Sequence, residues 1–341
     1  MGRRAMINLK NNELVISIPE VHENAVCAIE FQRTLRIPDD NREYPLPPGL
    51  GGFPLEHVKK HAARVPPAWV EHGGILMPMY QAEAMWISFS SRGHPSYPFA
   101  IKIAAGKINA VTGDAWDNDL HADPQDYVVI PEQPWLDGFC VQKGLIRQFV
   151  AMPLGKGYTA EEQLTGAAEH GGLQIIAFPM KRERYEALLR KWEEECARAP
   201  SPDDDLMFCL SADEPEMGLA AGGLMRQEIY EDPYGIDAWD TTHARCFVHI
   251  LNSAQWQTVT GTPAPGQPPT AADYTNAGLP WFEHYDDRLT ALPGSKVLAG
   301  LDSVAAKGIK LGEKPLPENE PVTPGTIIQT GPTSKVDDGK W

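Results

Sequence analysis

The chain has 341 residues, 42% of them hydrophobic, and a formal net charge of −16 at pH 7. That hydrophobic fraction is typical of a globular protein with a sizeable core and excludes a wholly disordered chain. The acidic balance disfavours nucleic acid and anionic membrane surfaces as partners, because both are bound through clustered Lys and Arg, which we do not find.

The first twenty residues contain basic side chains but lack the apolar core of a secretory signal. No apolar run approaches the roughly 20 residues that a membrane helix requires. The five cysteines are scattered and form no CxxC pair, so the sequence predicts neither a zinc knuckle nor a disulfide framework. We therefore expect a cytoplasmic protein with reduced, mostly buried thiols.

The 31 prolines and 30 glycines divide the chain into short segments, which favours strands and turns over long helices. Residues 27–37 alternate apolar and polar side chains with the period of a half-buried strand, interrupted by Arg33. Residues 14–18 are the expected hairpin partner of that strand. Further strands are predicted at 85–90, 99–104, 126–131, 145–152, 173–178, 206–211, 224–230 and 245–251.

Helices are predicted at fewer places. The clearest is 183–199, where apolar residues recur at helical spacing. Residues 55–65 repeat that spacing, and residues 295–308 are expected to form a late helix that stops at Gly308. Each of these segments is short compared with the number of residues assigned to strands.

Two capping boxes, TAEE at 159–162 and TAAD at 270–273, each predict the start of a short helix. The predicted strands do not alternate regularly with the predicted helices. That order favours an α+β fold, mainly antiparallel β-sheet with a few short helices, over a parallel α/β fold.

From about Glu313 the sequence becomes rich in proline and polar residues, a composition typical of extended segments. We divide the chain into a single compact domain at 1–312 and an extended Pro-rich C-terminal arm at 313–341. The arm is expected to lie against its own body or against a neighbouring subunit, and we expect a homo-oligomer formed through it. The aromatic residues at 278–289 are expected either to pack within the chain or to contact a partner.

The pattern Gly-Leu-x-Arg-Gln occurs twice, in GLIRQF at 144–149 and in GLMRQE at 223–228. As strands, both copies would place Gln in an apolar row and Arg on the opposite face. Three interpretations stay open. The copies are a recurrent hairpin geometry with Gly at positive φ, an internal duplication, or a joint site in which Arg147 and Arg226 bind a small anionic ligand.

Asp117, Asp119, His121 and Asp123 alternate along residues 114–126. Oxygen ligands at this spacing form calcium loops, and a histidine would suit zinc or manganese. The calcium pattern is incomplete, because it lacks its glycine and its final glutamate. A metal site and a solvent-exposed turn loop are both consistent with the pattern.

Trp135, Asp137 and Cys140 fall in the non-periodic stretch 131–140, which is predicted to be a loop. Functional residues concentrate on such loops, so Asp137 and Cys140 are candidate catalytic residues. Cys140 would be a nucleophile only if a histidine lowered its pKa, and a small buried thiol is the alternative. Trp135 is a candidate ligand-binding residue, or else an anchor of the core or of an interface.

No phosphate loop, dinucleotide fingerprint or catalytic signature is present, which leaves any cofactor unknown. We expect a non-catalytic cytosolic protein that self-associates and binds a small anionic ligand. The alternative is a hydrolase that uses either a metal at the 117–123 loop or a thiol in the 131–140 loop.

Overall fold

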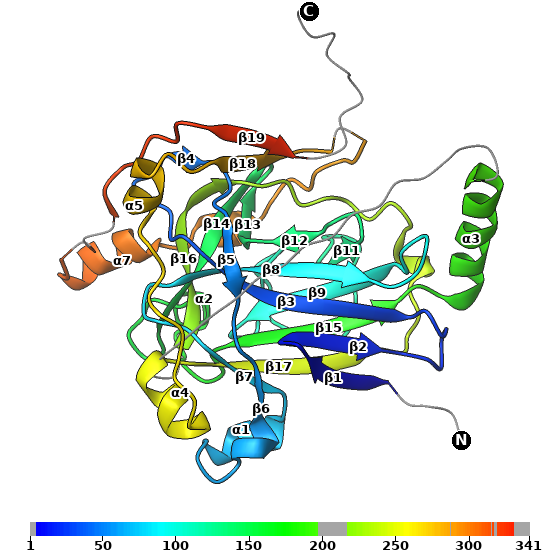
Figure 1. Cartoon of the computed structure of the whole chain (residues 1–341), viewed down its shortest axis with the longest axis horizontal. Coiled ribbons are helices and arrows are strands. Elements are labelled where there is room, and N and C mark those ends of the chain that lie inside the picture. Colours follow the sequence, from blue (N-terminus) through cyan, green and yellow to red (C-terminus); the bar gives the residue numbers. More distant parts are fainter. Residues whose placement is uncertain (1–4, 197–216, 287, 315, 317–318, 331–341) are drawn as a thin grey trace, which may run out of the picture.

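A computed structural model describes residues 5–196, 217–286, 288–314, 316 and 319–330. Within them, 17 strands belong to one continuous sheet, and a parallel two-stranded ribbon lies beside it (Figure 1). Most strand pairs are antiparallel and the helices are short, so the predicted α+β fold is confirmed. No helix of the described segments is long and apolar enough to cross a membrane.

The strands of the large sheet are β1 (Met6–Lys10), β2 (Glu13–Ser17), β3 (Val26–Thr34), β4 (Glu43–Tyr44), β5 (Gly49–Gly52), β6 (Glu56–His57), β7 (Ile75–Pro78), β8 (Ala84–Ser91), β9 (Phe99–Ala105), β10 (Ile108–Asn109), β11 (Val128–Ile130), β12 (Trp135–Leu136), β13 (Gly138–Gln142), β14 (Leu145–Pro153), β15 (Leu173–Pro179), β16 (Met217–Arg226) and β17 (Ala244–Leu251). The ribbon consists of β18 (Trp281–His284) and β19 (Ile327–Thr330). The α-helices are α1 (Pro67–His72), α2 (Ala160–Thr165), α3 (Arg182–Cys196), α4 (Ser253–Thr260), α5 (Ala271–Asn276), α6 (Lys296–Ala299) and α7 (Val304–Leu311), and the 3-10 helices are η1 (Val58–His61) and η2 (Ile236–Ala238).

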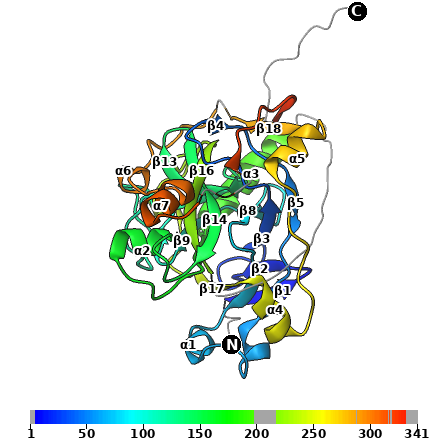
Figure 2. The same cartoon turned by 90° about the vertical axis from the view of Figure 1, so that its left-hand side faces the viewer.

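Two sections make up the large sheet. In the first, β1, β2, β3 and β8 are successive antiparallel neighbours, and β8 leads through β14 to β16. In the second, β11, β9, β15 and β17 are antiparallel neighbours, and β7 adds a parallel edge to β17. The buried side chains of both sections form one core cluster. Helices α1 and α4 lie at one end of the molecule and the β18–β19 ribbon at the other (Figures 1 and 2).

Strand β3 shows why the alternating pattern forms a strand here. Ile29 and Phe31 are buried in the core, whereas Ala28, Glu30 and Gln32, which alternate with them, are half-buried on the outer face. Arg33, which interrupts the apolar row, is also buried, and its guanidinium Nε donates to Oε1 of buried Glu83 at 2.6 Å. A second Arg33 donor reaches the carbonyl oxygen of Gly266 at 2.7 Å. The charge is therefore tolerated in the core because it is paired.

Most of the other predicted elements are confirmed. The predicted strand at 224–230 is right only for its first three residues, because β16 begins at Met217 and ends at Arg226. The predicted strand at 206–211 lies outside the described residues. Both capping boxes are present, with reciprocal side-chain and backbone hydrogen bonds at the starts of α2 and α5. The confirmed strand predictions are 14–18, 27–37, 85–90, 99–104, 126–131, 145–152, 173–178 and 245–251, which match β2, β3, β8, β9, β11, β14, β15 and β17, and the helix predicted at 183–199 matches α3.

The predicted helix at 55–65 is wrong. This segment forms strand β6 and the single 3-10 turn η1. Strand β6 pairs with β7, and the amide of Val58 donates to the carbonyl oxygen of Gly74 at 3.2 Å. Backbone pairing with an edge strand therefore overrides the helical spacing of the apolar side chains.

The predicted single helix at 295–308 is also wrong in extent. It is two helices, α6 and α7, and Ser303 caps the second one through its side chain. The second helix continues through Gly308 and ends at Gly312, whose φ of 76° is left-handed. A new cap inside the segment restarts the helix, which the apolar spacing did not reveal.

The two Gly-Leu-x-Arg-Gln copies lie on neighbouring antiparallel strands, β14 and β16. Gly144 is left-handed with a φ of 74°, whereas Gly223 sits within β16 and allows close approach of the Pro38 carbonyl oxygen, 2.5 Å from where a Cβ atom would lie. A shared positive-φ hairpin glycine is therefore the wrong explanation for the second copy. The Leu of each copy faces the Arg of the other across a local two-fold axis, and the register is Leu145↔Arg226, Ile146↔Met225 and Arg147↔Leu224.

Each glutamine of the repeat is buried, as its strand position predicted. The Gln148 amide accepts from the Ile37 amide at 3.1 Å and donates to the Leu35 carbonyl oxygen at 2.9 Å. The Gln227 amide accepts from the Asp137 backbone amide at 3.0 Å and donates to the Asp137 carboxyl group at 2.7 Å. Both glutamines thus satisfy buried polar groups of a segment that passes beside the paired strands.

The described part of the C-terminal arm lies against the body of its own chain. Glu313 accepts a hydrogen bond from the Tyr158 hydroxyl at 2.7 Å. Asn319 and Asp39 form a reciprocal pair, in which the Asp39 amide donates to Asn319 at 2.8 Å and the Asn319 amide donates to the Asp39 carbonyl oxygen at 3.0 Å. Strand β19 then pairs with β18. The described part of the arm is therefore docked at three points.

Candidate functional site

A cleft in the described part of the chain has a cavity volume of about 1030 Å³. Its lining comes from five segments that are far apart in the sequence, namely 111–114, 122–127, 140–142, 231–236 and 292–299. A cavity of this size can hold a small organic molecule, since ligand pockets typically measure about 300–1,000 Å³. The cleft is therefore the primary candidate for a binding site.

Three hydrogen bonds hold the Asp232 carboxylate in the cleft lining. Its Oδ2 accepts hydrogen bonds from the Tyr127 hydroxyl at 2.7 Å and from the Trp239 indole at 2.8 Å. Its Oδ1 accepts from the Tyr234 amide at 2.8 Å. Burial and the adjacent Asp232 carboxylate raise the pKa of Tyr127, so the hydroxyl stays protonated and remains a donor. Three donors therefore fix the carboxylate at the edge of the cavity.

The cleft lining is acidic and partly apolar. Four carboxylates and one ammonium group line it, which leaves an excess of negative charge: Asp114, Asp123, Glu231 and Asp232 against Lys296. Two of the lining side chains are large, apolar and unusually exposed, namely Ile236 at 37% and Val297 at 46%. This combination suits a ligand that carries a positive charge on an apolar body.

Cys140 lines the cleft but is almost completely buried, with 2% of its surface exposed. Burial raises its pKa to about 12, so the thiol is protonated at neutral pH. It lies on strand β13, and most of the stretch 134–142 is β12 and β13, so the prediction of a loop at 131–140 is wrong for its second half. The buried thiol lacks the properties of a nucleophile.

Asp137 and Trp135 do not line the cleft. Asp137 is buried, its carboxyl group accepts from Gln227, and burial raises its pKa to about 7. Trp135 is half-buried on the outer face, where its ring packs edge-on against Trp86 and His284 with centroid distances of 6.3 and 4.7 Å. Trp135 and Asp137 are thus neighbours, whereas Cys140 lies apart from them in the cleft lining.

The acidic loop folds around a buried lysine from strand β9. The Nζ atom of Lys102 lies 2.8 Å from Oδ1 of Asp117, 2.6 Å from Oδ2 of Asp126 and 2.6 Å from the carbonyl oxygen of Asp119. Nδ1 of His121 lies 2.9 Å from the same Asp126 oxygen. The hydrogen bond to Asp126 raises the pKa of His121. Lys102 itself is 1% exposed.

Of the four predicted metal ligands, the structure brings two together. Side-chain ligand atoms of Asp117 and His121 lie within 4.8 Å of one another and of Asp126, which the sequence did not single out. Asp119 offers its carbonyl oxygen rather than its carboxylate to Lys102, and Asp123 lines the cleft instead. The ammonium group already supplies a positive charge between the carboxylates, so the cluster has an internal counter-ion.

The two arginines of the repeat each have an acidic partner. Nη1 of Arg147 donates to the Gly222 carbonyl oxygen at 3.1 Å and lies 3.8 Å from Oδ1 of Asp39. Nη1 of Arg226 lies 2.7 Å from Oε1 of Glu283. Both arginines lie on the same face of the paired strands, but neither lines the cleft. Their guanidinium groups are therefore engaged within the chain.

The chain was compared with known proteins at three levels. No protein-family model, no curated protein and no solved structure matches it. The chemistry of the cleft is therefore the basis for inferring a function.

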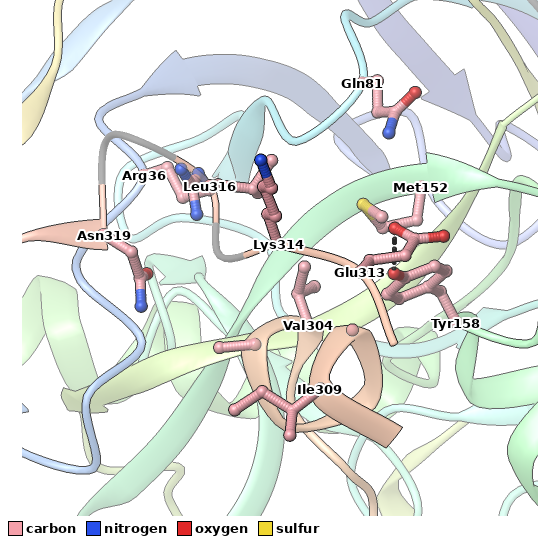
Figure 3. A pocket seen from close by; sticks show the side chains of 12 residues that line it. Arg36, Gln81, Met152, Tyr158, Val304, Ile309, Glu313, Lys314, Leu316 and Asn319 are labelled. Carbon is pink, nitrogen blue, oxygen red and sulfur yellow. Dashed lines mark hydrogen bonds between the residues drawn. The ribbon is translucent and has the colours of Figure 1, made fainter. Parts of the chain in front are cut away.

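A smaller pocket lies between α7, β14 and the start of the arm (Figure 3). Figure 3 shows the hydrogen bond from Tyr158 to Glu313 on one side, and Arg36 and Lys314 on the other. Its cavity volume of about 30 Å³ is the share of one liquid water molecule. It is too small for an organic ligand, which leaves the large cleft as the candidate site.

Two residues of the cleft lining, Asp123 and Cys140, were candidates from the sequence. Asp232, the lining carboxylate that accepts three hydrogen bonds, was not. Asp232 occurs in the turn-like sequence EDPYG at 231–235. An acid beside proline, tyrosine and glycine, residues typical of turns, was the available signal. Two of its donors, the Tyr234 amide and the Trp239 indole, are local, but Tyr127 is 105 residues away, so the local sequence does not reveal the whole site.

Proposed function

We propose that this is a binding protein whose cleft takes a small cationic ligand, an amine with an apolar body. The observation that carries the proposal is the Asp232 carboxylate, which Tyr127, Trp239 and the Tyr234 amide hold at the cavity edge. A carboxylate fixed before the ligand arrives loses little conformational entropy on binding. Asp232 is therefore the expected anchor for the ammonium group.

The strength of that anchor follows from its environment. Hydrogen bonds to charged groups contribute about 1.5–3 kcal/mol each, because both charge and geometry favour them. The neighbouring Asp114, Asp123 and Glu231 carboxylates add a negative potential that attracts cations over a longer range. Lys296 is the single opposing charge of the lining. An anionic ligand would have to overcome this potential.

The apolar part of the ligand has an expected place as well. Ile236 and Val297 line the cleft and expose 37% and 46% of their surface. Covering such surface stabilises a complex by about 25 cal/mol per Å² of apolar area. A purely polar cation, such as a free metal ion, would leave these side chains in water. The negative potential of the lining and its exposed apolar side chains together favour an organic amine.

The protonated Cys140 thiol and the ion pairs of Lys102 favour binding without covalent chemistry. The Cys140 thiol, with a pKa of about 12, is protonated at neutral pH, and the acidic loop holds Lys102 between Asp117 and Asp126. The hydrolase stays a prediction, but it would need a thiolate or a metal that these environments disfavour.

Two further expectations also stay predictions. An anion at Arg147 and Arg226 would first have to displace Asp39 and Glu283, so the cleft supports a cation better than the repeat supports an anion. A cytosolic location agrees with the free, buried thiols of the described core, Cys27, Cys140 and Cys246.

The proposal is tested by isothermal titration calorimetry of the full chain with spermidine, choline and arginine methyl ester, and with citrate and ATP as anionic comparisons. At least one amine should bind, and Asp232→Asn should weaken its affinity about tenfold or more, the equivalent of about 1.4 kcal/mol. Asp237→Asn is the matched control, because Asp237 is exposed in the same segment but does not line the cleft.

Equal losses in Asp232→Asn and Asp237→Asn would mean that only the general negative potential acts, and would reject Asp232 as the anchor. Binding of citrate or ATP in preference to every amine would reject the cationic ligand class.

A further inference from the structure

Strand β19 has a neighbour on one side only. It pairs in parallel with β18, and the other side of β18 pairs with Leu46, since Phe282 and Leu46 exchange backbone hydrogen bonds at 2.8 and 2.9 Å. No strand of the described chain pairs with the outer edge of β19. Figure 1 shows the ribbon at one end of the molecule, with β19 outermost. The backbone groups of this edge are available to another strand.

Exposed apolar side chains gather around this edge. Four of the exposed large hydrophobic residues belong to the ribbon or adjoin it, and they are Leu279 at 45%, Tyr285 at 40%, Ile327 at 44% and Ile328 at 43%. All four residues of β19 are exposed, so neither face of the strand is covered. A four-residue, two-stranded parallel ribbon is a marginal structure when it is not extended by further strands.

We infer that the outer edge of β19 pairs with the same edge of a second copy of this chain, antiparallel and about a two-fold axis. The strand is Ile-Ile-Gln-Thr, which is uncharged, in a protein with a net charge of −16. Most surfaces of two such chains repel each other, and this edge is an uncharged exception. It also lacks the lysine, proline or bulge with which natural edges block pairing. A two-fold axis closes the assembly at a dimer.

The register follows from the bonds to β18. The Trp281 amide donates to the Thr326 carbonyl oxygen, and Trp281 lies opposite Ile327. In a parallel pair this means that Ile328 directs its backbone N–H and C=O groups toward β18, whereas Ile327 and Gln329 direct theirs outward. The antiparallel register that pairs all of Thr326–Thr330 therefore centres on Ile328, with Ile327 opposite Gln329 of the second copy. Ile328 faces its own symmetry mate without hydrogen bonds between them.

That register predicts a specific cross-link. Non-hydrogen-bonded antiparallel pairs have Cα atoms about 4.5 Å apart, which lies at the lower end of the range that a disulfide bridges. Ile328→Cys should therefore form a symmetric disulfide dimer under mild oxidation. Ile327→Cys is the matched control, since it has the same exposure but faces Gln329. Both variants are made with Cys196 and Cys209 replaced by serine, because the remaining native thiols are buried.

The assembly is measured without a cross-link as well. Light scattering of the unmodified chain at increasing concentration should approach twice the 37.6 kDa of one chain. Gln329→Pro removes an outward N–H group and leaves the Ile328 bonds to β18 in place, so it should lower the dimer fraction severalfold. Thermal unfolding of Gln329→Pro checks that the body is still folded.

A chain that stays monomeric at every concentration, or cross-linking of Ile327→Cys as efficient as that of Ile328→Cys, would overturn the inference. The latter result would show contact between copies in another register. The dimer does not depend on the ligand of the cleft, so the failure of either proposal leaves the other standing.

Discussion

The Tyr127 hydroxyl donates to Oδ2 of Asp232 at 2.7 Å, across 105 residues of sequence. This bond joins the loop before β11 to the segment after β16, and both segments line the cleft. It helps to hold the carboxylate in place within the cleft lining. The position of the proposed anchor is thus a tertiary property, formed only when the two segments meet.

Tyr127→Phe removes this donor and keeps the ring. We expect the affinity for an amine ligand to fall about fivefold, equivalent to about 1 kcal/mol, because Asp232 becomes less firmly held. Calorimetric titration of the variant measures the change. Tyr97→Phe is the control, since the Tyr97 hydroxyl is also buried but bonds to the Met180 carbonyl oxygen away from the cleft. Equal affinities of wild type and Tyr127→Phe would contradict the positioning role.

Asp137 should make stability depend on pH. Burial raises its pKa from 3.8 to about 7 in the folded chain. Because the folded state binds this proton more tightly, the stabilisation is complete below about pH 4 and is lost as the pH rises through about 7. The loss is on the order of 4 kcal/mol, from about 1.36 kcal/mol per pKa unit. The Asp137→Asn variant should lack this pH-dependent part of the free energy of unfolding.

Urea unfolding of wild type and of Asp137→Asn between pH 4.5 and about pH 8 would measure the difference in the free energy of unfolding. Wild type should lose stability relative to Asp137→Asn over this range. Parallel curves for the two proteins would show that Asp137 does not titrate there.

Lys102→Met should destabilise the protein by about 3–5 kcal/mol, because it leaves Asp117 and the buried Asp126 without their counter-ion. Adding Asp126→Asn should recover part of that loss. Thermal unfolding of the single and double variants measures both effects. A double variant no more stable than Lys102→Met would argue against a charge effect.

Metal addition distinguishes two interpretations of the cluster around Lys102, namely a metal site and a set of ion pairs. We expect EDTA to leave the melting temperature of the wild type unchanged, since Lys102 supplies the positive charge. In Lys102→Met, the Asp117, His121 and Asp126 ligand atoms lie within 4.8 Å of one another, so Mn²⁺ or Zn²⁺ should raise the melting temperature. A wild type that loses stability in EDTA would restore the metal-site prediction.

Gln148→Ala should cost about 2–4 kcal/mol of unfolding free energy, because the Ile37 amide and the Leu35 carbonyl group would both lose a buried partner. Gln142→Ala is the control, since Gln142 is exposed on the adjacent strand β13. Denaturant unfolding of both variants gives the comparison. A cost for Gln148→Ala no larger than that for Gln142→Ala would mean that water satisfies the two backbone groups.

Much of the fold was predictable because its signals are local. The alternation of Ile29 and Phe31 with polar neighbours gave the face of β3, and the capping boxes at Thr159 and Thr270 gave the first residues of α2 and α5. The segment 55–65 failed because pairing with β7 decided its conformation. The spacing of apolar residues does not indicate which strand edge has unpaired backbone N–H and C=O groups.

The site was predicted less well, since its groups meet only in the folded chain. Asp117 and His121 were identified from their spacing, but the two residues that complete the cluster, Lys102 and Asp126, were assigned to strands. A lysine inside the apolar run FAIKIA was the signal that an acidic partner must cover it. Asp232 had no such signal, because its donors Tyr127 and Trp239 have ordinary core environments.

The reciprocal bonds between Asp39 and Asn319, 280 residues apart, affect how the chain is made. The ribosome releases the amino-terminal strands first, yet Leu35 meets its partner Gln148 only 113 residues later, and Asp39 meets Asn319 only 280 residues later. A nascent chain arrested before Asn319 would therefore hold an incompletely closed body, vulnerable to proteases and chaperone-dependent.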